Sequence, residues 1–307
     1  MASHMSPTST TPLGLIAGEG EFPFLVARGA RRAGRRVIVV GLKGSADPAL
    51  RNESDVYYEA GVARLGRWIR CLRREGVCEA VMAGRVVKAR AMGLSLWRQF
   101  WYYLPDWSSI RVWLFRAADR RNDTLLAAVA DAMAERGVRL IDSTAYCQDA
   151  LAEEGTLTQA SFSAGLAADA DLGWQIAKEM GRLDVGQAIA IKNKDVIAVE
   201  AVEGTDRMIV RAGELCPSGG WLLVKTAKPR QDMRFDVPTI GPNTVENVHR
   251  AKGRAILIEA GKTLLLERNK TLATANRLGI AIVARRDPQV LLGPGHSVLP
   301  NKGADQS

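Results

Sequence analysis

The chain has 307 residues, a formal net charge of +9 at pH 7 and a pI near 9.6. A basic balance of this size suits an anionic partner such as a nucleotide, a nucleic acid or a membrane surface, but it also serves solubility alone. No apolar run reaches the ~18 residues that a membrane-spanning helix needs, and no secretory segment follows the start. We therefore expect a cytoplasmic protein with reduced thiols.

The numbers and spacing of histidines and cysteines restrict the metal sites and catalytic mechanisms that this chain could have. The four cysteines have no CxxC spacing, which argues against a zinc ribbon or a redox dithiol. Of the three histidines, His4 lies in a tag-like start and His296 in a tail, so only His249 is available to the body of the protein. This excludes a multi-histidine zinc site. Hydrolysis by this chain would more readily use carboxylates with a hard cation such as Mg²⁺.

The first half of the chain alternates between short apolar runs and amphipathic segments. Residues 1–11 are interpreted as a tag and disordered start, and the alternation begins after them. The pattern predicts strands at 13–17, 36–41, 77–83 and 138–141 and helices at 23–35, 62–75 and 124–136. Such βαβ units form parallel sheets, so we expect a Rossmann-like domain over 12–150.

A segment rich in tryptophan and arginine, 85–122, interrupts this domain. Apolar residues line one face of each of two predicted helices, which meet at Pro105, and Asp106 can cap the second. The pair would form an aromatic hairpin over 94–116. It could pack into the core, or it could offer an apolar surface with a cationic rim to acyl chains or an anionic membrane.

The second half forms a separate domain. A polar stretch places a linker at 151–163, followed by an α/β or α+β domain over 164–287 and a tail over 288–307. Two apolar runs bracket Lys192–Asp195 and predict a hairpin. Further strands are expected at 221–225 and 255–259, and helices at 167–180, 244–252 and 270–278.

The stretch LGLIAGEGEFPF, 13–24, resembles a dinucleotide-binding turn. The third glycine of that fingerprint is replaced by Pro23, and no acid follows the second strand to bind a ribose. The nicotinamide signature is therefore weak. A glycine turn at a helix N-terminus still suits an anionic ligand, and a purely structural tight turn is the alternative.

Two later segments carry ionisable groups. Glu200, Glu203 and Asp206 follow a predicted strand and could bind a divalent cation, or they could simply begin a helix capped by Thr205. Residues 225–241 combine four cations and two aspartates with two prolines. Phosphoryl transfer needs cations that bind the diphosphate oxygens and a carboxylate that holds Mg²⁺ or orients water. A salt-bridged surface loop is the simpler reading of this segment.

Four motifs together resemble the LpxI family, the UDP-2,3-diacylglucosamine pyrophosphatases of lipid A biosynthesis in Gram-negative bacteria. The motifs are LGLIAGxGxFP at the start, EMGRLDVGQA (179–188), VEAVEGTD (199–206) and KPRQDMRFDVPTIG (228–241). The resemblance implies hydrolysis of UDP-2,3-diacylglucosamine to 2,3-diacylglucosamine 1-phosphate (lipid X) and UMP, with Mg²⁺. It also implies an N-terminal Rossmann-like domain and a distinct C-terminal domain. We hypothesise that the substrate lies in a cleft between these domains.

The resemblance also suggests roles for residues. Asp236 matches the aspartate on which catalysis in the family depends, and Asp206 is the second catalytic choice; Asp236, Asp206 and Glu203 are the expected metal ligands. The substrate-binding set comprises Gly18, Gly20, Phe22, Pro23, Gly84, Asp123, Lys225, Lys228, Gln231, Arg234, Thr239 and Gly241. Arg85 and Asn122 depart from the residues that the family is expected to have at these positions.

The expected partners are the lipid substrate and, peripherally, the anionic cytoplasmic face of the inner membrane. No nucleic acid is expected, and a homodimer is left open. The residues leave two other functions open: a nicotinamide-dependent sugar-nucleotide oxidoreductase, and a non-catalytic basic protein that binds lipid or RNA.

Overall fold

The computed structural model describes residues 11–86, 106, 107, 109, 122–229 and 231–287, apart from the side chains of residues 122 and 123. The described chain divides into two units by its internal contacts. The first contains the chain up to Leu151 together with two later segments, 231–239 and Leu264–Arg268. The second contains Ala152–Pro229, Ile240–Thr263 and the chain from Asn269 onward.

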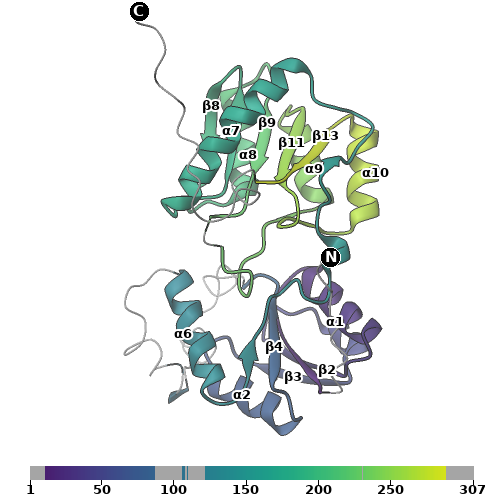
Figure 1. Ribbon diagram of the computed structural model, residues 1–307, viewed down its shortest axis with the longest axis vertical. Coiled ribbons are helices and arrows are strands. Elements are labelled where there is room, and N and C mark those ends of the chain that lie inside the picture. Colours follow the sequence, from purple (N-terminus) through teal and green to yellow (C-terminus); the bar gives the residue numbers. More distant parts are fainter. Residues whose placement is uncertain (1–10, 87–105, 108, 110–121, 230, 288–307) are drawn as a thin grey trace, which may run out of the picture. The chain divides into compact units, whose positions relative to one another are not determined.

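The first unit is built on a parallel sheet of five strands in the order β3-β2-β1-β4-β5 (Figure 1). This confirms the Rossmann-like prediction. The chain leaves β1 toward β2 and then returns to its other side at β4, so the order reverses between β1 and β4. In open sheets of this kind, ligands bind beyond the carboxyl ends of the strands at that reversal. The strands are β1 (Leu13–Ala17), β2 (Val37–Leu42), β3 (Val56–Ala60), β4 (Glu79–Ala83) and β5 (Arg139–Leu140).

Alternate residues of these strands fill two hydrophobic layers. Leu15 packs into one cluster and its neighbour Ile16 into the other, because successive side chains of a strand point to opposite faces. Figure 1 shows α1 (Phe22–Arg32) on one side of the sheet and α2 (Leu65–Arg74) and α6 (Asn122–Ala134) on the other. A 3₁₀ turn at Pro48–Glu53 precedes β3, a half-exposed edge strand that the apolar pattern did not predict.

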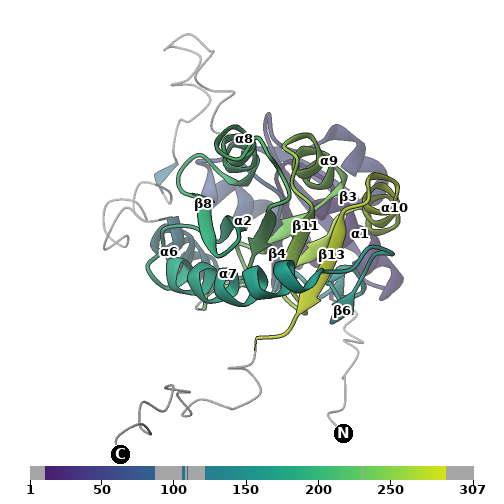
Figure 2. The ribbon, with the colours of Figure 1, turned by 90° about the horizontal axis from the view of Figure 1, so that it is seen from above.

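The second unit holds a mixed six-stranded sheet in the order β6-β13-β11-β9-β7-β8, in which β9, β11 and β13 are parallel. Figure 2 shows α7 along one face and α8 and α9 along the other. The strands are β6 (Gly155–Thr156), β7 (Ala188–Lys192), β8 (Asp195–Val199), β9 (Leu222–Lys225), β11 (Ala255–Glu259) and β13 (Ala281–Arg285). The helices are α7 (Ala164–Arg182), α8 (Thr205–Leu215), α9 (Pro242–Arg250) and α10 (Arg268–Leu278).

The predicted hairpin is confirmed. Strands β7 and β8 pair antiparallel, and the turn residues Asn193 and Lys194 have φ of 50° and 64°. Positive φ at both central residues gives the turn a twist that matches the strands. The short strand β6 falls inside the expected linker and pairs with β13, so that stretch is part of the second sheet.

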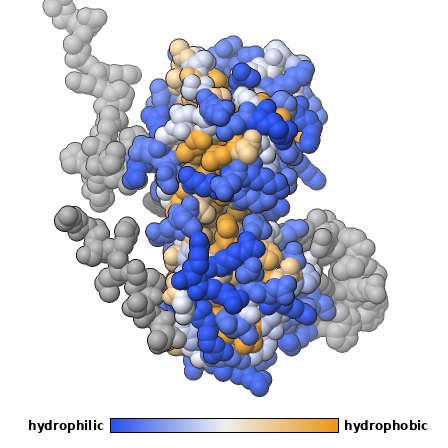
Figure 3. Space-filling model, turned by 90° about the vertical axis from the view of Figure 1, so that its right-hand side faces the viewer, coloured by the Kyte–Doolittle hydropathy of each residue, from blue (hydrophilic) through white to orange (hydrophobic). Residues whose placement is uncertain are grey.

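Two short strands and a 3₁₀ turn complete the described elements. Strands β10 (Thr239–Ile240) and β12 (Leu264–Leu265) form a two-stranded sheet, and the 3₁₀ turn covers Gln148–Ala150. From the side drawn in Figure 3, hydrophilic residues cover most of the described surface. Across the described ranges, every helix is too short or too polar to cross a membrane.

Candidate functional site

The glycine turn after β1 lies at the reversal of strand order, as a ligand-binding turn should. Its first glycine serves the fold, however. Gly18 is buried and donates its N–H to the Ala83 carbonyl at 2.8 Å, and the next N–H, of Glu19, donates to the Arg85 carbonyl at 2.8 Å. A Cβ on Gly18 would lie 2.6 Å from the Arg85 carbonyl oxygen. These two amides are therefore occupied by the backbone beyond β4.

Gly20 and Gly84 are the exposed members of this turn. Gly20 has a φ of 105° and no heavy atom within 4 Å of where a Cβ would stand, so the backbone there is open to a ligand. Helix α1 then begins without a side-chain cap, and the Phe24 N–H in its first turn already donates to the Glu21 carbonyl at 3.0 Å. Phe22 and Pro23 are buried, and Phe22 belongs to the hydrophobic core. Both residues therefore support the turn from the protein interior.

Asp236 is exposed on the loop that precedes Val237 and Pro238, both of which are buried. The Gln231 side-chain amide donates to the Asp236 carboxylate at 2.7 Å and to its carbonyl at 2.9 Å. The Asp236 N–H donates to the Asp232 carbonyl at 3.3 Å. These bonds orient an accessible carboxylate on a short, constrained loop.

Arg234, expected to face the substrate, is paired within its own loop. Its guanidinium donates to both oxygens of Asp232, at 2.6–3.1 Å. This hydrogen-bonded pair lowers the pKa of Asp232 and raises that of Arg234. Lys228 likewise donates to Asp184 at 2.5 Å. Part of the charge of both cations is therefore already offset by neighbouring carboxylates.

Ser143 anchors the Asp236 loop, a role that was not predicted from the sequence. Its hydroxyl lies 2.8 Å from the Arg234 carbonyl and 2.7 Å from the Met82 carbonyl of β4, and its N–H donates to the Met233 carbonyl at 3.0 Å. The side chain is fully buried. The only available signal was its place just after the predicted strand 138–141, at the edge where ligand sites collect.

A second cluster lies in the other unit, at the carboxyl end of β9. Lys225, the last residue of β9, donates to the Thr205 hydroxyl at 3.2 Å, and that hydroxyl donates to Glu200 at 2.7 Å. Lys225 and Glu200 are both buried. The reading of Thr205 as a helix cap is wrong: Gly204 is the N-cap, and Thr205 is the first residue of α8.

The expected metal ligands differ in their availability. Glu203 accepts from Arg211 at 2.5 Å and from the Ala201 N–H at 3.2 Å; its own backbone N–H first, and then Arg211, lower its pKa. Asp206 is exposed in the first turn of α8 and accepts from Asn247 at 3.2 Å. Within the described residues, no three His, Cys, Asp or Glu side chains could hold a metal together. Asp206 and Glu203 belong to the second unit and Asp236 to the first.

The remaining expected residues are placed as follows. Thr239 begins β10, and buried Gly241 is the N-cap of α9. Asp123 lies in the first turn of α6, but its side chain is outside the described part of the chain. Most of the aromatic hairpin also falls outside it. Of that segment, Asp106 caps the backbone of Ser109 as predicted, at 3.0 Å, and Trp107 is 75% exposed.

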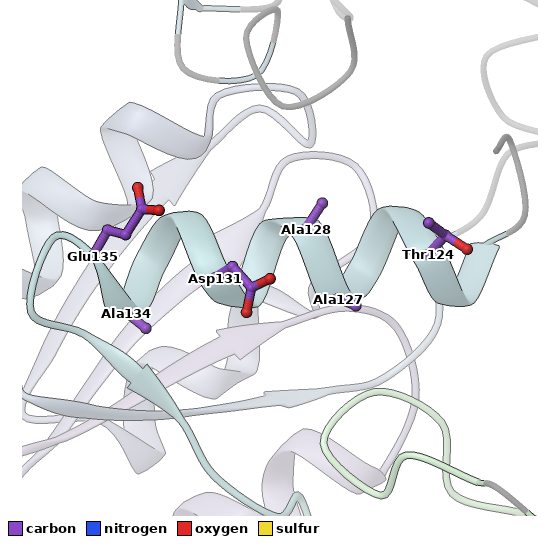
Figure 4. A pocket seen from close by; sticks show the side chains of 6 residues that line it. All are labelled: Thr124, Ala127, Ala128, Asp131, Ala134 and Glu135. Atoms are coloured by element: carbon purple, nitrogen blue, oxygen red, sulfur yellow. The ribbon is translucent and has the colours of Figure 1, made fainter. Parts of the chain in front are cut away.

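A pocket of about 620 Å³ runs along α6, lined by Thr124, Ala127, Ala128, Asp131, Ala134 and Glu135 (Figure 4). Its ionisable lining residues are two carboxylates, which disfavour a diphosphate. None of the expected site residues lines it.

Comparison with known proteins covers nearly the whole described chain. Residues 12–150 match the model of the LpxI N-terminal domain, and residues 153–283 match that of the LpxI C-terminal domain. A Caulobacter vibrioides protein named UDP-2,3-diacylglucosamine pyrophosphatase LpxI is 32% identical over 286 residues. The alignment covers 90% of this chain and 98% of that protein.

Proposed function

Because the chain belongs to the LpxI family, we propose that it is a hydrolase that cleaves the diphosphate of UDP-2,3-diacylglucosamine, in lipid A biosynthesis. The products are 2,3-diacylglucosamine 1-phosphate (lipid X) and UMP. The observation that carries this proposal is the similarity over both domains to a relative with that name, at 32% identity and 98% coverage of the relative. The nicotinamide alternative loses support, because the amides of Gly18 and Glu19 are already bonded to the backbone.

Asp236 is the proposed catalytic carboxylate. It is exposed, and Gln231 orients it at 2.7 Å. A carboxylate held in this way can accept a hydrogen bond from the attacking water and align it with the phosphorus, which reduces the entropy lost in reaching the transition state. Asp206, exposed in the first turn of α8, is the second proposed catalytic residue.

Lys225, Lys228 and Arg234 are proposed to offset the negative charge of the diphosphate. Cations placed where charge develops in the transition state lower the barrier to phosphoryl transfer. The turn at Gly18, Gly20 and Gly84, shaped by Phe22 and Pro23, is proposed to receive the sugar phosphate, with Gly20 offering the open backbone. The cleft between domains and the contacts of Asp123, Gln231, Thr239 and Gly241 with substrate stay predictions.

Mg²⁺ fits the residues present. Magnesium is commonly held by one or two carboxylates together with substrate phosphates and water, so a cage of three side chains is unnecessary. Asp236 and Asp206 are exposed carboxylates, and either one could contribute an oxygen to the ion, whereas Glu203 is engaged by Arg211. When bound, the ion would neutralise charge on the diphosphate oxygens.

Peripheral attachment to an anionic membrane surface on the cytoplasmic side is proposed from the net charge of +9 and the lipid substrate. The homodimer stays a prediction.

The test is incubation of the protein with UDP-2,3-diacylglucosamine and Mg²⁺, measuring UMP. We expect UMP from the unaltered protein and a loss of turnover of about 10³-fold or more in Asp236→Asn, with substrate binding largely retained, because the interaction is made mainly in the transition state. Asp195→Asn changes another exposed aspartate, in the β7–β8 hairpin, and should behave as the unaltered protein. Absence of UMP under every metal condition would refute the function, and near-normal Asp236→Asn would refute the role of Asp236.

A further inference from the structure

Three polar side chains form a directed chain at the carboxyl end of β9. Glu200 follows β8, Thr205 opens α8, and Lys225 ends β9, so three separate elements bring them together. The Lys225 ammonium donates to the Thr205 hydroxyl at 3.2 Å, and the hydroxyl donates to the Glu200 carboxylate at 2.7 Å. The other Glu200 oxygen accepts the Gln187 N–H at 3.4 Å.

The order of these bonds is set by chemistry. An ammonium can only donate, and an ionised carboxylate can only accept, whereas a hydroxyl does both. Glu200 takes the single proton of Thr205, so a lone pair of the hydroxyl is directed toward Lys225. The main chain adds rigidity: a Cβ on Gly186 would lie 2.1 Å from the Glu200 carbonyl oxygen, so the backbones of these two loops are in close contact.

Burial makes this orientation persistent. Glu200 is 8% exposed and Lys225 is 7% exposed, so water competes little for their hydrogen bonds. A surface lysine samples many rotamers, and fixing one costs conformational entropy at each binding event. Here that entropy is lost when the protein folds, which leaves the ammonium oriented in advance.

Resting on the proposed function, we propose that Thr205 and Glu200 are positioning residues that hold the Lys225 ammonium toward the substrate diphosphate. Neither is required to touch the reacting atoms; both act through Lys225. The cluster stands beyond the carboxyl end of a parallel strand, where open α/β sheets bind ligands. Glu200 also precedes the N-terminus of α8, whose dipole favours its negative charge.

The experiment is a double-mutant cycle on UMP release, with kcat and KM measured separately. Thr205→Val removes the hydroxyl while keeping the shape, and it should lower kcat/KM roughly 10- to 100-fold, mainly through kcat. Thr205→Ser keeps the hydroxyl and, unlike Thr205→Val, should retain most of the activity. Lys225→Met should lower kcat/KM by at least as much as Thr205→Val. The double variant should be no worse than Lys225→Met alone, because both changes remove one interaction.

Thr263→Val is the matched control. Thr263 is fully buried, and its hydroxyl has no hydrogen-bond partner in the described structure, so the same change should leave kcat/KM within about twofold. Thermal unfolding of every variant shows whether it is folded. A structural role alone would lower Tm without changing kcat per folded molecule.

The outcomes separate this role from the function itself. If the unaltered protein releases no UMP, the proposed function fails, and this role fails with it. If the unaltered protein is active and Thr205→Val matches it, only the positioning role is overturned. Full additivity of Thr205→Val and Lys225→Met would likewise overturn it, because the two residues would then act independently.

Discussion

At the scale of single residues, Gly84 shows why the turn after β4 requires glycine. It has a φ of 88°, and a Cβ there would stand 2.7 Å from the Glu19 carbonyl oxygen and 2.9 Å from the Pro23 ring. Gly84→Ala would therefore combine backbone strain with a clash against backbone that cannot move freely. We expect a loss of about 2–4 kcal/mol in the free energy of unfolding, measured with urea.

Gly76→Ala is the matched control for this prediction. Gly76 has a comparable φ of 75° but no heavy atom within 4 Å of the added Cβ. Its substitution should cost about 1 kcal/mol, the strain alone. Equal losses for the two variants would show that the crowding between the turns of β1 and β4 has no energetic weight.

At the scale of elements, the bounds of the strands were predicted best where an apolar run is buried on both faces. Strands β1 and β11 begin and end at the predicted residues, since five consecutive buried residues leave no ambiguity. The half-exposed β3 and the two-residue strands β6, β10 and β12 depend on pairing partners that a local pattern does not contain. The anchoring of the Asp236 loop depends on Ser143 and Arg234, which are 91 residues apart in sequence.

Ser143→Ala tests that anchor. It removes a buried hydroxyl that lies within hydrogen-bond distance of two carbonyls, one on β4 and one on the Asp236 loop. We expect the free energy of unfolding to fall by about 1–2 kcal/mol and kcat to fall more than the unfolded fraction explains, because the loop carries the catalytic carboxylate. Urea unfolding and UMP release measure the two effects.

Ser54→Ala serves as the control, since the Ser54 hydroxyl makes an exposed bond to the Arg51 carbonyl at 3.1 Å. Its stability should stay within about 0.5 kcal/mol of the unaltered protein. A Ser143→Ala variant with the same small effect, and with unchanged kcat, would contradict the anchoring role.

At the scale of the whole molecule, the two compact units and the family domains do not coincide. The C-terminal family model spans 153–283, yet 231–239 and Leu264–Arg268 group with the N-terminal unit. Val237 and Leu264 belong to the same hydrophobic cluster as Leu13 and Leu15 of β1. Linear reading of the sequence assigned Asp236 to a C-terminal catalytic domain, because contacts between distant segments leave no local pattern. The proposed catalytic loop is thus supported by the unit that carries the glycine turn.

Leu264→Ala tests this grouping. Leu264 is fully buried, so its truncation should cost about 2–5 kcal/mol, and the loss should reach β1 because both belong to one core. Hydrogen exchange followed by mass spectrometry should show faster exchange of the Leu13–Ala17 amides, although those amides are some 250 residues away in sequence. Leu215→Ala, at a leucine that is 60% exposed, should leave this exchange unchanged. Faster exchange confined to 152–229 would instead place Leu264 energetically with the second unit, and the proposed support of the Asp236 loop by the first unit would fail.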